Sequence, residues 1–273
     1  MPDFMTLLPL VAFLLAVGAL AGVLAGLLGV GGGIVLVPAF YYVFQVLGYD
    51  GPQVMQVCVA TSLATIVVTS WRSVKAHGAK GAIDWDILRR WGPGIAIGAL
   101  LGSVTATQLR SETLTAIFAV LALIVALYMA FSKPHWRLAD RMPQGPRVLA
   151  YSPAVGFASV LMGIGGGSFG VPLMTLHNVA IHRAVATAAG FGMLIAVPAV
   201  ILFLILPTEA ARPPLTLGLV NGPAFVVIVA MTVLTAPLGA RLAHKMDPGP
   251  LKRVFAFFLF LVALNMLRKA IWG

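Results

Sequence analysis

The stretch LLGVGGGIVLVP, residues 27–38, places three consecutive glycines inside a strongly apolar run. A similar stretch, LMGIGGGSFGVP, follows at residues 161–172. Each glycine weakens a helix by about 1 kcal/mol relative to alanine, so both stretches predict an interrupted helix. Because the glycines and the proline that follows them recur at one fixed offset, we interpret the two stretches as copies within an internal repeat.

Other matches between the two halves of the chain support this repeat. Ala60-Thr61 corresponds to Ala186-Thr187 at a slightly shorter offset, which indicates one shorter loop. The segments GALLGS (98–103) and TAPLGA (235–240) are also similar to each other. We therefore expect a membrane repeat at 1–132, a cytoplasmic linker at 133–147 and a second membrane repeat at 148–273.

The composition excludes a soluble protein. Of the 273 residues, 60% are hydrophobic and only 10% are charged, whereas soluble domains average about 25% charged residues. The net charge of +10 would suggest a nucleic-acid partner in a soluble protein. Here the basic residues lie between apolar runs, as expected for loops that remain inside the cell, so we predict no nucleic-acid binding. The fold class we expect is an all-α polytopic membrane protein.

The charge-free runs set the number of crossings. No charged residue occurs in the 46 residues from Phe4 to Tyr49, although a single crossing needs only about 20. The chain must therefore turn back within this run, and the glycines at 31–33 are the obvious place. The whole sequence predicts about 8–10 membrane segments, with broken or short helices at the two triple glycines.

The distribution of basic residues favours an odd number of segments in each half. Five segments per half place 14 of the 18 Lys and Arg residues inside, and four per half place 12 inside. An odd number makes the two halves inverted repeats, which are typical of secondary transporters. Half-helices at 34–47 and 170–181 that enter and leave one face are the alternative, so a full turn and a re-entrant pair both stay open.

The glycine breaks are also the predicted binding site. Helix N-termini beside such breaks present free N–H groups and a positive dipole end, which suit an anion. No Asp or Glu lies clearly inside a membrane segment, so the substrate must be held by backbone, hydroxyl or Arg groups. Hydroxyl residues also cluster on the segment at 61–70, where Thr61 has a duplicate in the second half. The predicted substrate-binding residues are Gly31, Gly32, Gly33, Thr61, Ser62, Arg72, Gly165, Gly166, Gly167, Ser168 and Thr187.

The sequence predicts no catalytic residue, cofactor or metal site. Residues 166–170 spell G-x-S-x-G, but the nucleophile elbow of hydrolases needs a strand before the serine, and here the setting is a membrane helix. The five histidines show no metal-ligand spacing.

The chain resembles the TauE/SafE family of sulfite exporters and organosulfonate permease-like proteins from about residue 10 to 270. The resemblance rests on GLLGVGGGIVLVP, ATSLATIVVTSWRSVKAH and GAIDW in the first half. LMGIGGGSFGVPLM and PLGARLAHKMDPGPLKRVFA carry it in the second half. It implies a multi-pass protein of the bacterial inner membrane that transports small sulfur-containing anions, such as sulfite or sulfoacetate, or related carboxylates.

The residues themselves predict an inverted-repeat carrier with a helix-break site for an anion, working by alternating access. An anion channel of the same architecture and an intramembrane enzyme are the alternatives, and the enzyme would need a buried catalytic cluster that the sequence lacks. The expected partners are a small anion and the lipid bilayer. A coupling ion, the oligomeric state and the direction of transport stay open.

Overall fold

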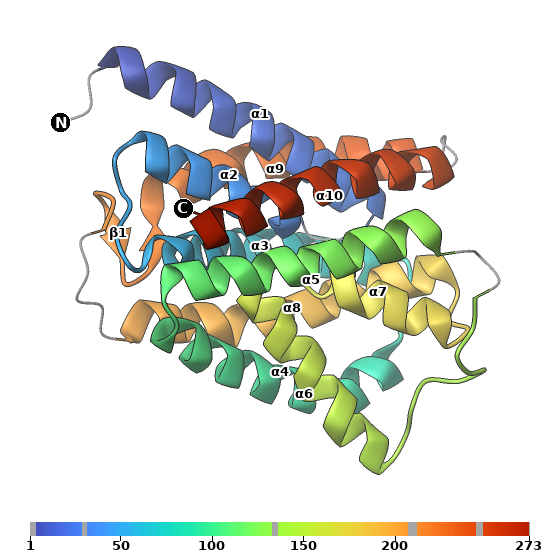
Figure 1. Ribbon diagram of the computed structural model, residues 1–273. Coiled ribbons are helices and arrows are strands. Elements are labelled where there is room, and N and C mark those ends of the chain that lie inside the picture. Colours follow the sequence, from blue (N-terminus) through green and yellow to red (C-terminus); the bar gives the residue numbers. More distant parts are fainter. Residues whose placement is uncertain (1–3, 29–31, 133–135, 207–211, 244–247, 273) are drawn as a thin grey trace.

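The computed structural model describes residues 4–28, 32–132, 136–206, 212–243 and 248–272 (Figure 1). These residues form ten helices and one two-stranded hairpin. The elements are α1 (Phe4–Leu28), α2 (Gly33–Val46), α3 (Val54–Gly78), α4 (Trp85–Gln108), α5 (Ser111–Phe131), α6 (Pro146–Leu161), α7 (Gly167–Leu176), α8 (Ile181–Ile205), β1 (Thr216–Leu217), β2 (Val220–Asn221), α9 (Gly222–Ala243) and α10 (Pro248–Trp272).

The predicted fold class, an all-α polytopic membrane protein, is confirmed. Within the described residues, six helices are long and apolar enough to cross a membrane, namely most of α1, α3, α5, α8, α9 and α10. α2 and α7 are shorter apolar helices, and each follows one of the glycine stretches. Large apolar side chains such as Phe131, Ile205 and Phe257 are exposed on the outside of the bundle, where lipid would cover them.

One charge-free run is not a continuous helix. No charged residue occurs from Pro213 to Ala240, but the first part of this run forms the β1–β2 hairpin and only the rest is helical. Consecutive prolines at 213 and 214 lack the N–H groups that a helix interior needs. α9 therefore begins only at Gly222, where the Asn221 side-chain oxygen accepts a hydrogen bond from the Ala224 N–H at 3.1 Å.

The bundle has two ends, which we name by what lies there. The linker end holds the end of α5, the described linker residues 136–145 and the start of α10, on the right in Figure 1. The Leu138 N–H of the linker donates to the Leu176 carbonyl, so α7 also ends there. The hairpin end holds β1–β2, and it holds the starts of α3 and α5, which are joined by a hydrogen bond from the Ser111 N–H to the Pro52 carbonyl.

The helices pack in matching pairs. α1 packs on α9, and α6 packs on α4; α2 packs on α3, and α7 packs on α8. α5 packs on α10, and α3 packs on α8. Suppose that α1 to α5 correspond in order to α6 to α10. The pair α1–α9 then corresponds to α6–α4, and α2–α3 corresponds to α7–α8. The pairs α5–α10 and α3–α8 each correspond to themselves. Figure 1 shows that the members of one such pair, α5 and α10, run in opposite directions.

Close backbone contacts repeat this correspondence at the level of single residues. A Cβ at Gly102 of α4 would lie 3.0 Å from the carbonyl oxygen of Phe157 in α6. A Cβ at Gly239 of α9 would collide with the carbonyl oxygen of Val23 in α1. Gly102 and Gly239 are at the same position of the similar segments GALLGS and TAPLGA. Val23 and Phe157 are separated by the same number of residues as the two glycine stretches, so they also correspond to each other.

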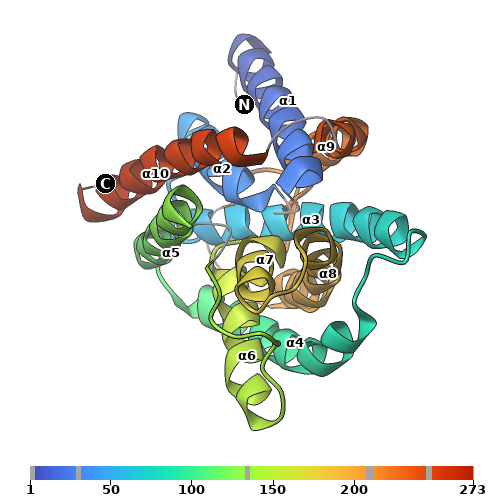
Figure 2. The same ribbon diagram turned by 90° about the vertical axis from the view of Figure 1, so that its right-hand side faces the viewer.

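The centre of the bundle is formed by α3, α7 and α8, which the other helices surround in the end-on view of Figure 2. In the apolar window of α3, 78% of the residues are buried, against 33% in α1. α3 is therefore the helix best placed to contribute side chains to a site inside the protein.

Candidate functional site

The second glycine stretch separates α6 from α7 in the middle of the bundle. α6 ends at Leu161, and α7 begins at Gly167, whose turn is closed by a hydrogen bond from the Gly170 N–H to the Gly166 carbonyl at 2.8 Å. A Cβ at Gly166 would lie 2.7 Å from the carbonyl oxygen of Ala188 in α8. A side chain at this position would push α7 away from α8, so the close approach requires glycine.

The first glycine stretch separates α1 from α2 and contacts the second. Gly32 has a φ of 68°, and Gly33 begins α2. A Cβ at Gly33 would lie 2.5 Å from the Gly163 carbonyl oxygen and 3.0 Å from the Ser62 hydroxyl. Ser62 in turn donates a hydrogen bond to the Gly163 carbonyl at 2.7 Å. The two breaks thus meet at α3, while the predicted site residue Gly31 lies outside the described residues.

A cavity borders the second break. Its volume of about 30 Å³ leaves room for one or a few water-sized molecules, since a water needs about 10–15 Å³. It lies on the linker-end side of the break, because its lining residues on α3 are in the half of that helix away from the hairpin end, and those on α8 are near the start of that helix, which follows the end of α7. The lining residues come from four elements: Ala25 of α1; Thr69, Ser70 and Ser73 of α3; Gly165, Gly166 and Gly167 at the start of α7; and Ala188 and Ala189 of α8.

Ser70 is the polar side chain best placed to bind a ligand in this cavity. Only 6% of its surface is exposed, and its hydroxyl has no hydrogen-bond partner among the described residues. A neighbouring lining residue differs, because the Thr69 hydroxyl donates to the carbonyl of Thr65 at 3.2 Å. Because the Ser70 hydroxyl borders the cavity and has no partner among the described residues, it is free to donate a hydrogen bond to a molecule that enters the cavity.

The buried hydroxyl of Ser168 also lacks a partner in the described residues. It lies in the first turn of α7, where the helix's own N–H groups have no partners within the helix. Of the predicted site residues, Gly165, Gly166, Gly167 and Ser168 are therefore grouped by the structure at one helix N-terminus.

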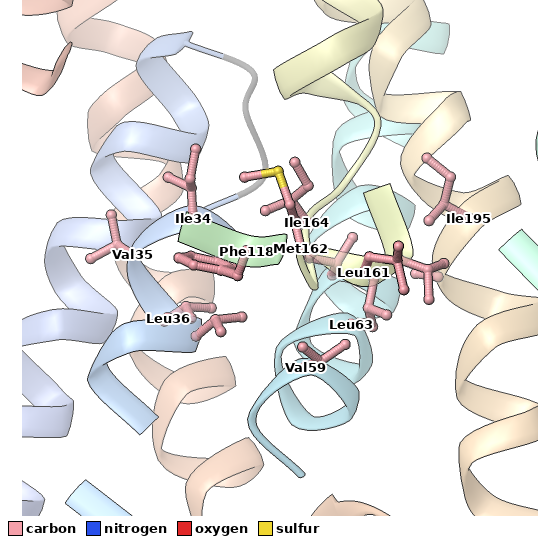
Figure 3. Close-up of a cluster of buried hydrophobic side chains, with 14 of the residues drawn as sticks. Ile34, Val35, Leu36, Val59, Leu63, Phe118, Leu161, Met162, Ile164 and Ile195 are labelled. Carbon is pink, nitrogen blue, oxygen red and sulfur yellow. The ribbon is translucent and has the colours of Figure 1, made fainter. Parts of the chain in front are cut away.

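The corresponding position beside the first break is apolar. At the offset that relates Thr61 to Thr187, the counterparts of Thr69, Ser70 and Ser73 are Ile195, Ala196 and Ala199 of α8. All three are fully buried. Figure 3 shows side chains of the packed core around the breaks, with Ile34 and Leu36 of α2 near Val59 and Leu63 of α3 and with Ile195 on α8.

Thr61 and Thr187 each join the two halves of the chain. The Thr61 hydroxyl accepts a hydrogen bond from the Asn221 N–H at 2.9 Å, just before α9. The Thr187 hydroxyl accepts one from the Asp84 N–H at 2.9 Å, just before α4. Neither Thr61 nor Thr187 lines the cavity. In this structure the two hydroxyls form hydrogen bonds between the halves of the chain and do not border the cavity at the second break.

The predicted site residue Arg72 also lies away from the cavity. It is exposed and shares a separate surface hollow with Trp71 and Lys75, whose ammonium lies 5.8 Å from the Trp71 ring centroid. Arg72 follows Ser70 by two residues on α3, and positions two apart on a helix point to different sides.

The described residues contain no buried acid and no group of three or more His, Cys, Asp or Glu side chains that could hold a metal ion. The polar lining residues that the sequence did not single out as binding residues are Thr69, Ser70 and Ser73. Thr69 and Ser70 were visible in the sequence as part of a hydroxyl cluster, but only the packing of α3 against α8 shows that they border the cavity.

Comparison with known proteins gives a family and relatives of nearly the same length. The family described as sulfite exporter TauE/SafE matches residues 14–266. A probable membrane transporter protein of Haemophilus influenzae is 34% identical over 256 residues, which cover 93% of this chain and 97% of the relative. A probable membrane transporter protein of Methanocaldococcus jannaschii is 27% identical over 266 residues, 97% of each chain.

A third relative, the probable membrane transporter protein YunE of Bacillus subtilis, is 24% identical over 279 residues. No solved structure gives a significant match. With the family match across most of the sequence and six candidate membrane spans, the chain belongs to the sulfite exporter TauE/SafE family and is a membrane transporter rather than an enzyme.

Proposed function

We propose that the protein is a secondary transporter of small anions, in particular sulfur oxoanions, sulfonates or related carboxylates. The observation that carries this proposal is the cavity at the N-terminus of α7, where the unpartnered Ser70 hydroxyl lies beside the free first turn of a helix. Hydrogen-bond donors and a positive dipole end favour an anion in such a place. The preference for sulfur-containing anions is supported only by the name of the family, sulfite exporter TauE/SafE.

We further propose that the two halves, 1–132 and 148–273, are inverted repeats that move against each other across a plasma membrane, the inner membrane of a bacterium. The matching helix pairs and the opposite directions of α5 and α10 support this arrangement. The cavity opens on the linker side of the breaks, where sequence-based topology places the cytoplasm. A carrier needs a second state that opens the breaks toward the hairpin end.

The binding part of the proposal is tested on purified full-length protein. Its melting temperature is measured with sulfite, thiosulfate, sulfoacetate, sulfolactate, methanesulfonate, acetate and sulfate, with chloride as the ionic-strength control. We expect at least one sulfur oxoanion, sulfonate or carboxylate to raise the melting temperature, because a ligand that binds only the folded state stabilises it. If none does, the proposed anion site is wrong.

Transport is tested with the same protein in proteoliposomes. A carrier exchanges internal unlabelled anion for external labelled anion, and the rate saturates as concentration rises. Electrical conductance without saturable exchange would show that the protein is an anion channel and not a carrier.

The inverted arrangement is tested by labelling single cysteines at the ends of the two short helices. In a chain whose own Cys58 is replaced by alanine, Asp50→Cys follows α2 and Ala180→Cys follows α7, and both positions are exposed. We expect an impermeant thiol reagent to label them from opposite faces of the membrane. Labelling from the same face would contradict inverted repeats.

A further inference from the structure

We propose that the cavity at the second glycine break selects monoanions over dianions of similar size. This inference rests on the proposed function and narrows its substrate class. It starts from the charge of the lining: none of the described residues that border the cavity is ionisable. The sequence at 29–31, which lies outside the described residues, is also uncharged, as Gly-Val-Gly.

The donors available in the cavity are neutral. They are the hydroxyls of Ser70 and Ser73, which have no hydrogen-bond partner among the described residues, and the free N–H groups at the start of α7. Ser70 is a buried residue, with 6% of its surface exposed. A helix N-terminus acts as about +0.5 of an elementary charge. This partial charge can compensate much of one negative charge but only a small part of two.

Transfer from water into the protein amplifies this difference. The Born cost of burying an ion grows with the square of its charge, so a dianion loses about four times as much hydration free energy as a monoanion of equal radius. The stabilisation that neutral hydrogen-bond donors give to an anion rises by much less than four-fold when the charge of the anion doubles. A site without a cation therefore discriminates against the second charge.

The described Lys and Arg side chains on α3 and α8, two of the helices that line the cavity, do not remove the difference. Arg72 and Lys75 on α3 are exposed and border the separate surface hollow, where water and salt screen them. Arg183 at the start of α8 is exposed and paired with Asp84 at 3.2 Å.

The size of the cavity restricts the substrate as well. Its apolar walls are the small side chains of Ala25, Ala188 and Ala189. Among the candidate anions, this favours compact monoanions such as hydrogen sulfite, acetate and simple sulfonates. The second charge, and not the size, disfavours sulfate. Both charge and size disfavour sulfoacetate and sulfolactate, which carry a carboxylate in addition to the sulfonate.

The test compares methanesulfonate with sulfate, two tetrahedral sulfur anions of similar size that differ by one charge. Binding to the purified full chain is measured by titration calorimetry at constant ionic strength, and proteoliposome exchange is measured with the same pair. We expect methanesulfonate to bind and to exchange, with an affinity at least about ten-fold higher than that of sulfate.

Three results overturn the inference in different ways. If both anions bind and sulfate binds as tightly as methanesulfonate or more tightly, charge selection is wrong while the proposed anion transport stands. If sulfate, sulfoacetate or another dianion binds while methanesulfonate and acetate do not, the inference alone fails. If none of the anions in the melting-temperature series binds or exchanges, the proposed function fails together with the inference.

A gain-of-charge variant locates the effect in the cavity. Ser73→Arg places a cation in the lining, and Ser73→Lys is the substitute if the first variant does not fold. Ala76→Arg adds the same charge on the exposed face of α3, beside the other hollow. We expect the Ser73 variant, and not the Ala76 control, to raise the affinity for sulfate relative to methanesulfonate by about ten-fold. An equal ratio in all three proteins would overturn the inference.

Discussion

At the first glycine break, Gly33 packs against the Gly163 carbonyl and the Ser62 hydroxyl, whereas the second break, at 165–167, borders a cavity. Both breaks use three consecutive glycines, and each is followed by a short helix. The difference lies in the helix that supplies the neighbouring side chains. Ser70 of α3 faces the second break, while its counterpart in α8 is Ala196.

This comparison separates what the duplicated motif does from what its surroundings do. The glycines allow chain segments to approach closely, and this requirement is the same in both halves. Binding needs polar groups that are free to interact as well. Among the described residues, Ser70 and Ser168 at the second break have such hydroxyls, whereas the Ser62 hydroxyl at the first break already donates to the Gly163 carbonyl. We infer that the repeat supplies the scaffold and that divergence between α3 and α8 supplies a single site.

The largest effect is expected from adding a methyl group at either break. In Gly166→Ala the new Cβ would lie 2.7 Å from the Ala188 carbonyl oxygen, and in Gly33→Ala it would lie 2.5 Å from the Gly163 carbonyl oxygen. Overpacking of this kind costs about 1–3 kcal/mol. We expect both variants to lose exchange activity and to melt at lower temperature.

The matched control for these two variants is Gly78→Ala at the end of α3. Its added Cβ would meet only the Ile83 side chain, at 3.8 Å. Thermal unfolding and proteoliposome exchange should therefore remain near those of the parent protein. A tolerated Gly33→Ala or Gly166→Ala would contradict the close approach at that break.

The next largest effect distinguishes the two breaks directly. Ser70→Ala removes the unpartnered hydroxyl, and hydrogen bonds to charged groups are worth about 1.5–3 kcal/mol, so we expect affinity for methanesulfonate to fall about ten-fold or more. Ala196→Ser places a hydroxyl at the corresponding position beside the first break and should leave affinity unchanged. Calorimetric titration of both variants is the measurement. Equal loss in both would mean that the site is shared between the breaks.

Much of the fold could be predicted because it depends on local properties of the chain. The charge-free stretch from Phe4 to Tyr49 is too long for one crossing, and the helices α1 and α2 lie within it. The β1–β2 hairpin shows the limit of this reasoning, since residues 213–221 are uncharged without forming part of a membrane helix. Hydropathy alone does not distinguish these cases, and the prolines at 213 and 214 were the signal that could have done so.

The candidate site was harder to predict because it depends on contacts between distant segments. The duplication of Thr61 and Thr187 suggested a binding role, yet both hydroxyls accept backbone N–H groups from the other half. Ser70 has no duplicate, and its exposure to the cavity follows from how α3 packs against α8. Sequence symmetry thus identified two positions that join the halves by hydrogen bonds, and the binding role predicted for them stays a prediction.

A smaller effect is expected at these two threonines. Thr61→Val leaves the buried Asn221 N–H without its acceptor, and an unpaired buried donor costs about 1–3 kcal/mol. Thr187→Val should cost less, because Asp84 is only partly buried and water can replace the hydroxyl. Melting temperatures of the two variants measure the difference. A larger loss from Thr187→Val would contradict this ranking.

The smallest effect is expected at the linker end. The Arg183–Asp84 ion pair is partly open to solvent, with 57% of the Arg183 side chain and 23% of the Asp84 side chain exposed. Such pairs contribute about 0–1 kcal/mol, so Arg183→Gln should lower the melting temperature only slightly, and less at high salt. The counterpart of Arg183 in the first half is the buried Val57, so this pair has no equivalent at the hairpin end. A loss that does not decrease with salt would show that Arg183 has another role.

The central claim, that a small anion binds beside the second break and not beside the first, is tested most directly by ligand protection of a single cysteine. In the chain with Cys58→Ala, Ser70→Cys and Ala196→Cys are each treated with a small thiol reagent, with and without methanesulfonate. We predict that Ser70→Cys reacts, that methanesulfonate slows its reaction, and that Ala196→Cys remains unmodified in the folded protein. Equal rates at Ser70→Cys with and without the anion, or protection at Ala196→Cys alone, would contradict the account.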